Sequence, residues 1–186
     1  MANPTASATL PTLLILASGR GERFLASGGT THKLQADLGG KTVLERTLDA
    51  VRASGLPWHL EDRGHPGMGD SIAAAVRAAP DAAGWLILPA DLPLIDPQTL
   101  LALARASTDA DVLVPDYQGQ RGHPVRFARR CGEALRALRG AAGASAVAAS
   151  FPSARWPVDD PGCVMDIDTL ADLERARALF RQKTGA

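Results

Sequence analysis

Short apolar runs that alternate with amphipathic helical segments constrain this chain more than any other feature. Residues 12–17 and 85–89 are continuous apolar runs, which are typical of strands buried on both faces of a parallel sheet. Residues 42–53 and 70–79 carry apolar side chains at helical spacing, so both segments predict helices with one buried face. Further strands are expected at 57–60, 111–114 and 124–127, and further helices at 97–106, 129–138, 145–149 and from 169 onward.

This alternation predicts strand–helix–strand units and therefore a sheet flanked by helices. The 186 residues suffice for one domain with its own core. The sequence thus predicts an α/β protein, a three-layer Rossmann-like sandwich with a mostly parallel sheet and a single domain. Residues 1–10 are expected to form a disordered leader and residues 11–186 the domain. Ligands of such sheets bind beyond the carboxyl ends of the strands.

Composition narrows the class of partner. Twenty Lys and Arg residues balance twenty Asp and Glu residues, so neither a nucleic acid nor a membrane surface is expected as the main partner. The two cysteines, Cys131 and Cys163, fit no paired motif, which indicates a reducing, cytoplasmic location. The apolar run at 13–17 is too short for a membrane span, and no basic residue precedes it as in a signal peptide.

A glycine-containing turn, LASGRGERF at 16–24, follows the first predicted strand. Such a turn can bring backbone N–H groups to a phosphate, although a plain strand-to-helix turn explains the glycines equally well. The third glycine of a dinucleotide-binding pattern is replaced by Phe24, which argues against a dinucleotide site. A second segment, GGKT at 39–42, lacks the first glycine of a P-loop because Gln35 occupies that position, so a turn and helix start fit better.

Several carboxylates invite a metal interpretation. Asp91 ends the strand within GWLILPADLPLI (84–95), where one carboxylate suits Mg²⁺, which prefers one or two carboxylates plus substrate phosphates. The alternative is a turn residue whose side chain caps its own backbone. The cluster HLEDRGH (59–65) lacks the spacing of a zinc site. Four further acids are expected as solvated loop charges: Asp109, Asp111, Asp159 and Asp160.

Five segments occur in the order that is typical of one protein family: LASGRGERF followed by Lys33, GMGDS (67–71), PADLPLI (89–95), RGHPVRF (121–127) and DIDTLADL (166–173). Together they resemble the MobA-like nucleotidyltransferases, and most closely the molybdenum cofactor cytidylyltransferases. The resemblance extends from about Leu13 to the final helix. Two departures are visible. Arg23 and Lys33 are farther apart than is usual in the family, and the segment between 54 and 66 is short.

The resemblance implies a role for each matching residue. Nucleotide binding is implied for Ala17, Ser18, Gly19, Arg23, Lys33, Gly67, Met68 and Ser71. A catalytic role is implied for Arg23, Lys33 and Asp91. The implied Mg²⁺ ligands are Asp91 and Asp168, with Asp166 as a nearby candidate. The loop beside the acceptor is implied to contain His123 and Pro124.

The implied reaction is attack of a phosphorylated acceptor on the α-phosphorus of a nucleoside triphosphate, with release of pyrophosphate. Because the nucleophile is already an anion, positioning and charge neutralisation by Mg²⁺, Lys33 and Arg23 suffice without a general base. CTP is the favoured triphosphate and molybdopterin the favoured acceptor, and a molybdoenzyme or its maturation factor is the implied protein partner. Guanylyl transfer, transfer to a sugar or alcohol phosphate, and a non-catalytic nucleotide- or cofactor-binding relative remain as alternatives.

Overall fold

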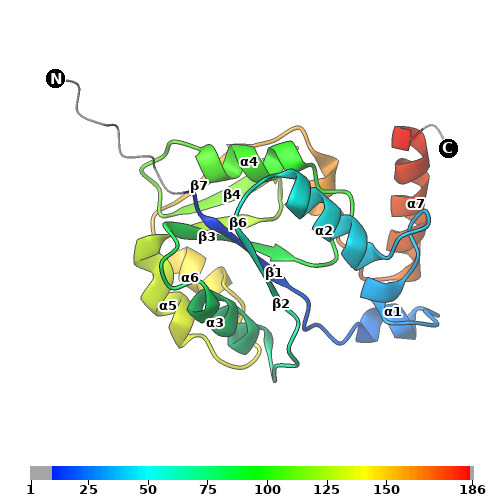
Figure 1. Cartoon of the computed structure of the whole chain (residues 1–186), viewed down its shortest axis with the longest axis horizontal. Coiled ribbons are helices and arrows are strands. Elements are labelled where there is room, and N and C mark those ends of the chain that lie inside the picture. The colour runs from blue at the N-terminus through cyan, green and yellow to red at the C-terminus, as the bar shows by residue number, and fades with distance from the viewer. Residues whose placement is uncertain (1–9, 185–186) are drawn as a thin grey trace.

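A central sheet lies between two layers of helices, as Figure 1 shows for this computed structural model. The structure describes residues 10–184, so the expected leader lies outside the described residues except for Leu10. The strands are β1 (Thr12–Leu16), β2 (Trp58–Glu61), β3 (Gly84–Pro89), β4 (Val112–Tyr117), β5 (Gln120–Arg121), β6 (Val125–Ala128) and β7 (Ser153–Pro157). The helices are α1 (Glu22–Ala26), α2 (Val43–Ala53), α3 (Met68–Ala78), α4 (Pro97–Arg105), α5 (Gly132–Ala137), α6 (Ser145–Ser150) and α7 (Leu170–Thr184). Three short 3₁₀ turns complete the described part of the chain: η1 (Lys33–Gln35), η2 (Arg129–Cys131) and η3 (Pro161–Val164).

The sheet is mostly parallel, as predicted. Its order is β2-β1-β3-β6-β4-β5, and β7 pairs with β4. Strand β1 is parallel to β2 and β3, and β4 is parallel to β7. Strand β6 is antiparallel to both of its neighbours, β3 and β4. The carboxyl ends of the parallel strands and the amino end of β6 therefore meet at one edge of the sheet.

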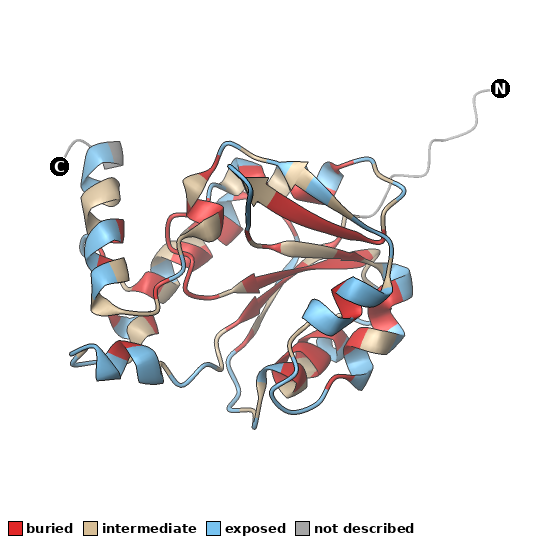
Figure 2. Cartoon of the chain, turned by 180° about the vertical axis from the view of Figure 1, so that it is seen from behind, coloured by how far each residue is buried: buried red, intermediate tan, exposed pale blue. Residues whose placement is uncertain are grey.

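The core divides into two clusters because side chains alternate between the faces of each strand. Leu13 and Ile15 of β1 join the cluster that contains buried residues of α2 and α4. Leu14 and Leu16 face the opposite cluster, which contains residues of α3, α5 and α6. Figure 2 shows the central strands in red, as expected for strands that are covered on both faces.

The segment GGKT is a turn followed by a helix, as the sequence predicts. Gly39 and Gly40 have φ values of 65° and 81°, the left-handed region that favours glycine. Thr42 and Glu45 then form a capping box at the start of α2. Lys41 lies at the surface, where its ammonium contacts Asp49 at 2.6 Å.

Helix α1 and the strands β5 and β7 were not predicted, and β5 has only two residues. Helix α1 forms within the expected loop because Phe24 is buried and anchors it to the core. Strand β7 pairs with β4 in the sheet, but its residues are only partly buried, so its sequence shows little apolar pattern.

The prediction that Asp111 and Asp160 are solvated is wrong. Both are buried, and the Asp160 carboxylate accepts hydrogen bonds from the backbone N–H groups of Asp96 and Gly162. Among the described residues, no helix is both long and apolar enough to cross a membrane.

Candidate functional site

The carboxyl edge of the sheet brings three charged side chains into contact. Asp91 follows β3, Lys33 opens η1, and Asp168 lies two residues before α7. The Lys33 Nζ lies 2.5 Å from Asp91 Oδ2 and 2.8 Å from Asp168 Oδ1. One ammonium therefore bridges two carboxylates that are distant in the sequence, and all three side chains are at most one-fifth exposed.

Backbone hydrogen bonds hold the two carboxylates in register. The N–H of Ile167 donates to the Asp91 carbonyl oxygen at 3.0 Å, and the N–H of Ala90 donates to the Leu16 carbonyl oxygen at 3.0 Å. The Thr47 hydroxyl, which is fully buried, donates to the Ala90 carbonyl oxygen at 2.9 Å. Asp91 is thus fixed by its own strand, by α2 and by the segment that carries Asp168.

The Asp168 carboxylate is free of the helix end that it precedes. The carboxylate of Asp172 accepts the N–H of Thr169 at 2.7 Å, and the Thr169 hydroxyl accepts the N–H of Asp172 at 3.2 Å. Thr169 and Asp172 thus form a capping box at the start of the helix that the sequence predicts from 169 onward. The Asp168 carboxylate therefore contacts Lys33 and Arg23 instead of the helix end. Its Oδ2 lies 2.8 Å from Nη1 of Arg23, whose side chain is largely exposed.

Electrostatics keep the bridge charged. Burial by itself lowers the pKa of Lys33, but the charges and hydrogen bonds of Asp91 and Asp168 outweigh it and raise the pKa above 10.5. Asp91 Oδ1 is buried and has no hydrogen-bond partner among the described residues. Partial desolvation, together with the charges of Asp91 and Asp168, raises the pKa of Asp166 above its usual range.

The turn after β1 lies beside this cluster. The N–H of Ala17 donates to the Glu61 carbonyl oxygen at 2.9 Å, and the Ser18 and Ser71 hydroxyls share a hydrogen bond. The His32 Nε2 lies 2.8 Å from the Gly19 carbonyl oxygen. The structure therefore brings together Ala17, Ser18, Gly19 and Ser71, which come from two of the predicted nucleotide-binding segments.

Close packing of the backbone requires glycine at both glycine positions of GMGDS, whether or not a ligand binds there. A Cβ on Gly67 would lie 2.1 Å from the carbonyl oxygen of Gly140. The N–H of Gly69 donates to that same oxygen at 2.8 Å, and Asp70 accepts the N–H of Gly140 at 2.8 Å. The start of α3 is thereby pressed against the turn between α5 and α6, whereas the Met68 side chain is nearly half exposed.

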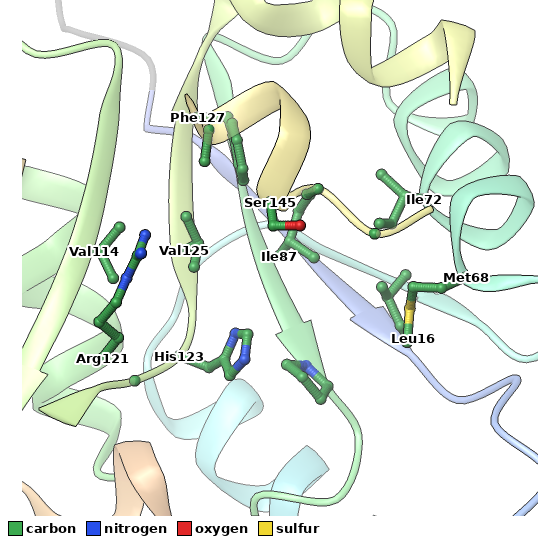
Figure 3. Close-up of a pocket in the computed structure, with 15 residues that line it drawn as sticks. Leu16, Met68, Ile72, Ile87, Val114, Arg121, His123, Val125, Phe127 and Ser145 are labelled. Atoms are coloured by element: carbon green, nitrogen blue, oxygen red, sulfur yellow. The ribbon is translucent and has the colours of Figure 1, made fainter. Parts of the chain in front are cut away.

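A pocket of about 340 Å³ opens next to the cluster, between the sheet and helices α3 and α6. Figure 3 shows Leu16, Ile87, Val125 and Phe127 on the sheet side, with Met68 and Ile72 across from them. Three polar side chains also line it: Arg121, His123 and Ser145. Of the two predicted acceptor residues, His123 lines the pocket and Pro124, which follows a cis peptide bond, does not.

His123 connects the pocket to the charged cluster. Burial lowers the pKa of His123, against the opposing effects of the Asp91 charge and a hydrogen bond to the Ile87 carbonyl, so the imidazole is neutral at pH 7. Its Nδ1 is buried and lacks a hydrogen-bond partner within residues 10–184. Arg121, on β5, makes no ion pair with any other described residue. These two groups are available to a ligand.

The sequence places Glu61 in the HLEDRGH cluster and predicts no site there, but the residue supports the turn after β1 through its backbone carbonyl. Its carboxylate is buried and is contacted by His59, Arg63 and His65 at 3.3, 3.2 and 3.1 Å. Burial by itself raises the pKa of Glu61, but these hydrogen bonds outweigh it and lower the pKa below 4.5. No group of three or more potential metal ligands from His, Cys, Asp and Glu is found in the described part of the chain.

The family model described as the MobA-like NTP transferase domain matches residues 50–155, more than half of the chain. The chain belongs to the MobA-like NTP transferase family. The matched segment of this MobA-like chain contains Asp91, the GMGDS segment and His123, whereas Arg23, Lys33 and Asp168 lie outside it.

Individual proteins are similar to the chain in sequence or in fold. A curated relative, the bifunctional protein GlmU of Xylella fastidiosa (strain M12), is 29% identical over 135 residues, which cover 60% of this chain and 29% of GlmU. The chain thus spans less than a third of that relative. Rv0371c of Mycobacterium tuberculosis H37Rv has the same fold, with a TM-score of 0.76, 23% identity and coverage of 91% of this chain and 99% of Rv0371c.

Two further solved structures share the fold. Rv0371c has also been solved in complex with manganese, and that structure matches with a TM-score of 0.72, 23% identity and the same coverage of both chains. The molybdopterin-guanine dinucleotide biosynthesis protein A of Archaeoglobus fulgidus matches with a TM-score of 0.69 and 19% identity, over 92% of this chain and 99% of that protein.

Proposed function

We propose that this chain is a metal-dependent nucleotidyltransferase that moves a nucleoside monophosphate from a triphosphate to a phosphorylated small molecule. The observation that carries the proposal is the joint position of Lys33, Asp91 and Asp168 beside the turn at residues 17–19. Positively charged groups and backbone N–H groups at one sheet edge suit a triphosphate. Family membership supports the same reaction class.

The carboxylates fit a divalent cation. Asp91 has a buried oxygen without a partner, and Asp168 is held within reach of the same ion by the Ile167 backbone. Two carboxylates, completed by phosphate oxygens and water, are the ligands that Mg²⁺ prefers. When bound there, the cation would polarise the phosphoryl oxygens and neutralise charge that develops in the transition state.

The chain's own residues supply the remaining requirements. Backbone groups of Ala17, Ser18 and Gly19 would orient the triphosphate, and Arg23 and Lys33 would neutralise its oxygens. An oxygen of the acceptor phosphate forms a bond to the α-phosphorus while the bond from that phosphorus to the bridging oxygen breaks. The electron pair leaves with pyrophosphate, and no proton has to be removed from the nucleophile.

The pocket is the proposed acceptor site. It adjoins the cluster of Lys33, Asp91 and Asp168 through His123, whose pKa is affected by the charge of Asp91. Its neutral imidazole and the unpaired guanidinium of Arg121 would orient the acceptor, and apolar side chains would cover its body. By resemblance, the proposed substrates are CTP and molybdopterin. The proposed location is the cytoplasm, and the proposed protein partner is a molybdoenzyme or its maturation factor.

Two rival substrate assignments remain. Guanylyl transfer to the same acceptor is favoured by the name of the Archaeoglobus fulgidus protein that shares the fold. Transfer to a sugar or alcohol phosphate is favoured by the name of another solved protein with this fold, a 4-diphosphocytidyl-2C-methyl-D-erythritol synthase of Anaerococcus prevotii.

Pyrophosphate release separates these assignments. Each of the four nucleoside triphosphates is tested with Mg²⁺ or Mn²⁺, with molybdopterin, glucose 1-phosphate or no acceptor. We expect release to depend on acceptor and metal and to be fastest with CTP and molybdopterin. Release with glucose 1-phosphate alone would transfer the assignment to the sugar phosphates. Tight triphosphate binding without any release would indicate a non-catalytic relative.

A further inference from the structure

The Lys33 ammonium occupies the position that a divalent cation would need. Its two contacts are Asp91 Oδ2 and Asp168 Oδ1, one oxygen from each proposed metal ligand. The second oxygen of Asp168 contacts Arg23 at 2.8 Å. Of the four carboxylate oxygens, only Asp91 Oδ1 is without a cationic or hydrogen-bonding partner in the part of the chain described.

This arrangement is more than a loose surface ion pair. The Lys33 side chain is 13% exposed, and its ammonium lies within 2.8 Å of an oxygen of each carboxylate. The residue is placed by η1, whose N-cap His32 accepts the N–H of Leu34 at 3.3 Å and whose Leu34 side chain is buried. The lysine therefore reaches the carboxylates from a fixed piece of backbone.

We propose that Lys33 closes the metal site in the nucleotide-free chain, and that the divalent cation enters only when a triphosphate draws Lys33 and Arg23 onto its own oxygens. The proposal rests on the metal site of the proposed function. A single pair of carboxylate oxygens cannot hold an ammonium and a divalent cation together, because the two positive charges would repel each other at contact distance. The triphosphate resolves this competition by offering the two basic side chains new anionic partners.

Two consequences follow for binding. The cation and the triphosphate bind cooperatively, and each raises the affinity for the other by the same factor. Lys33 also has two positions in the cycle: between the carboxylates before the nucleotide binds, and on the phosphates afterwards. The site therefore neutralises its own carboxylates without a metal and does not bind a free divalent cation tightly when no substrate is present.

Binding of Mn²⁺ without nucleotide tests the proposal directly. The full-length chain and its Lys33→Gln and Lys33→Met variants are titrated with Mn²⁺, and free Mn²⁺ is followed by electron paramagnetic resonance. We expect both variants to bind Mn²⁺ at least about tenfold more tightly than the unaltered chain, the scale of one charge-assisted hydrogen bond. Lys33→Arg, which keeps the positive charge, should bind as weakly as the unaltered chain.

Lys41→Gln is the matched control. Lys41 makes a similar contact, 2.6 Å from Asp49, but on the exposed surface of α2. This variant loses one positive charge from the molecule without opening the cluster, so its Mn²⁺ affinity should not change. A gain equal to that of Lys33→Gln would show a general effect of net charge and would overturn the proposal.

Other outcomes also decide the matter. Equal or weaker Mn²⁺ binding by folded Lys33→Gln and Lys33→Met would overturn the proposal, as would tight Mn²⁺ binding to the unaltered chain without nucleotide. The second result needs no variant, so the test survives if the variants fail to fold. The readout is binding and not turnover. A tenfold gain in a chain that releases no pyrophosphate would uphold the lysine's role and reject the proposed reaction.

Discussion

Asp91 and Asp168 show how the fold brings two distant carboxylates to one ammonium. Both are ordinary loop aspartates in the sequence. Backbone hydrogen bonds from Ile167 and to Leu16 bring them to one edge, and the Thr169–Asp172 cap leaves the Asp168 carboxylate free. The bridging ammonium of Lys33 then removes the repulsion that two adjacent carboxylates would suffer.

Neutralising either carboxylate should abolish most of the proposed activity. We expect Asp91→Asn and Asp168→Asn each to lower the metal-dependent transfer rate at least about a hundredfold, the scale of losing one charge-stabilising group. Asp49→Asn, which removes an exposed carboxylate of α2 that contacts Lys41, is the matched control and should transfer normally. Steady-state pyrophosphate release measures all three variants. Near-normal rates for both site variants would reject these residues as metal ligands.

The buried Glu61 carboxylate predicts a dependence of stability on pH. Its pKa is lowered in the folded chain, so it stabilises the fold above the unfolded value of 4.5, and this contribution is lost as pH falls through the lower folded value. We expect the unfolding free energy, measured with urea, to decrease less below pH 4.5 in Glu61→Gln than in the unaltered chain. Glu133→Gln, at an exposed position of α5, should follow the unaltered chain. Identical pH profiles for all three would contradict this role.

At the scale of elements, short segments are held by contacts with distant parts of the chain. Helix α1 has five residues and no side-chain cap, and it depends on buried Phe24 and on the Ser27 hydroxyl, which accepts the N–H of Leu170 at 3.0 Å. The start of α3 depends on the turn at Gly140. Neither segment is long enough to be a stable helix alone.

The close approach of α3 to Gly140 should make Gly67 sensitive to substitution. A Cβ at this position would lie 2.1 Å from a backbone oxygen, so we expect Gly67→Ala to lower the unfolding free energy by about 1–3 kcal/mol, as overpacking does. Gly64→Ala is the control, because a Cβ there meets nothing within 4 Å. Urea denaturation compares the two. Equal stabilities would mean that the backbone at Gly140 moves aside at no cost.

The segment at residues 27–32 should respond to the triphosphate. It joins α1 to η1 and so connects Arg23 to Lys33, the two side chains that would move onto the phosphates. We expect its amide hydrogens to exchange more slowly when a non-hydrolysable triphosphate and Mg²⁺ are bound, as measured by mass spectrometry. The amides of β7, a strand of the sheet that is remote from residues 27–32, serve as an internal control. Strong and equal protection with and without ligand would argue against the prediction.

At the scale of the whole molecule, the sheet places two different surfaces on the same edge. Charged groups after β1 and β3 form the proposed triphosphate site, whereas the apolar pocket extends along the sheet to β4 and β6. The antiparallel strand β6 makes this possible, because its amino end brings His123 to the edge where the parallel strands end. The donor and the acceptor of the proposed reaction can therefore approach each other over Asp91.

Filling the pocket should separate the two binding events. Ala148 of α6 lines the pocket, and we expect Ala148→Phe to raise the acceptor KM at least about tenfold because the larger ring occupies the acceptor's volume. Triphosphate affinity, measured by calorimetry without acceptor, should change little. Ala149→Phe adds the same ring at the adjacent exposed position and should leave both quantities unchanged. Loss of triphosphate binding in Ala148→Phe alone would place the nucleobase in this pocket.

Much of the architecture could be predicted because its causes are local. The apolar runs of β1 and β3, the helical spacing in α2 and α3, and the caps at Thr42, Asp96 and Thr169 act within a few residues. Ligands bind at the carboxyl ends of parallel strands, and this rule predicts a site at Asp91. Residue types, helix caps and strand faces were thus determined by the sequence itself.

Tertiary structure alone decided how these pieces meet. Nothing local places β6 between β3 and β4 or pairs β7 with β4, because strand partners are chosen by long-range packing and hydrogen bonding. The same is true of Asp160, whose buried carboxylate accepts the N–H of the distant Asp96. The Lys33 bridge is a further case: the sequence names the three charged residues, but their contact exists only because three separate loops fold to one edge, where a buried charge must find its partner.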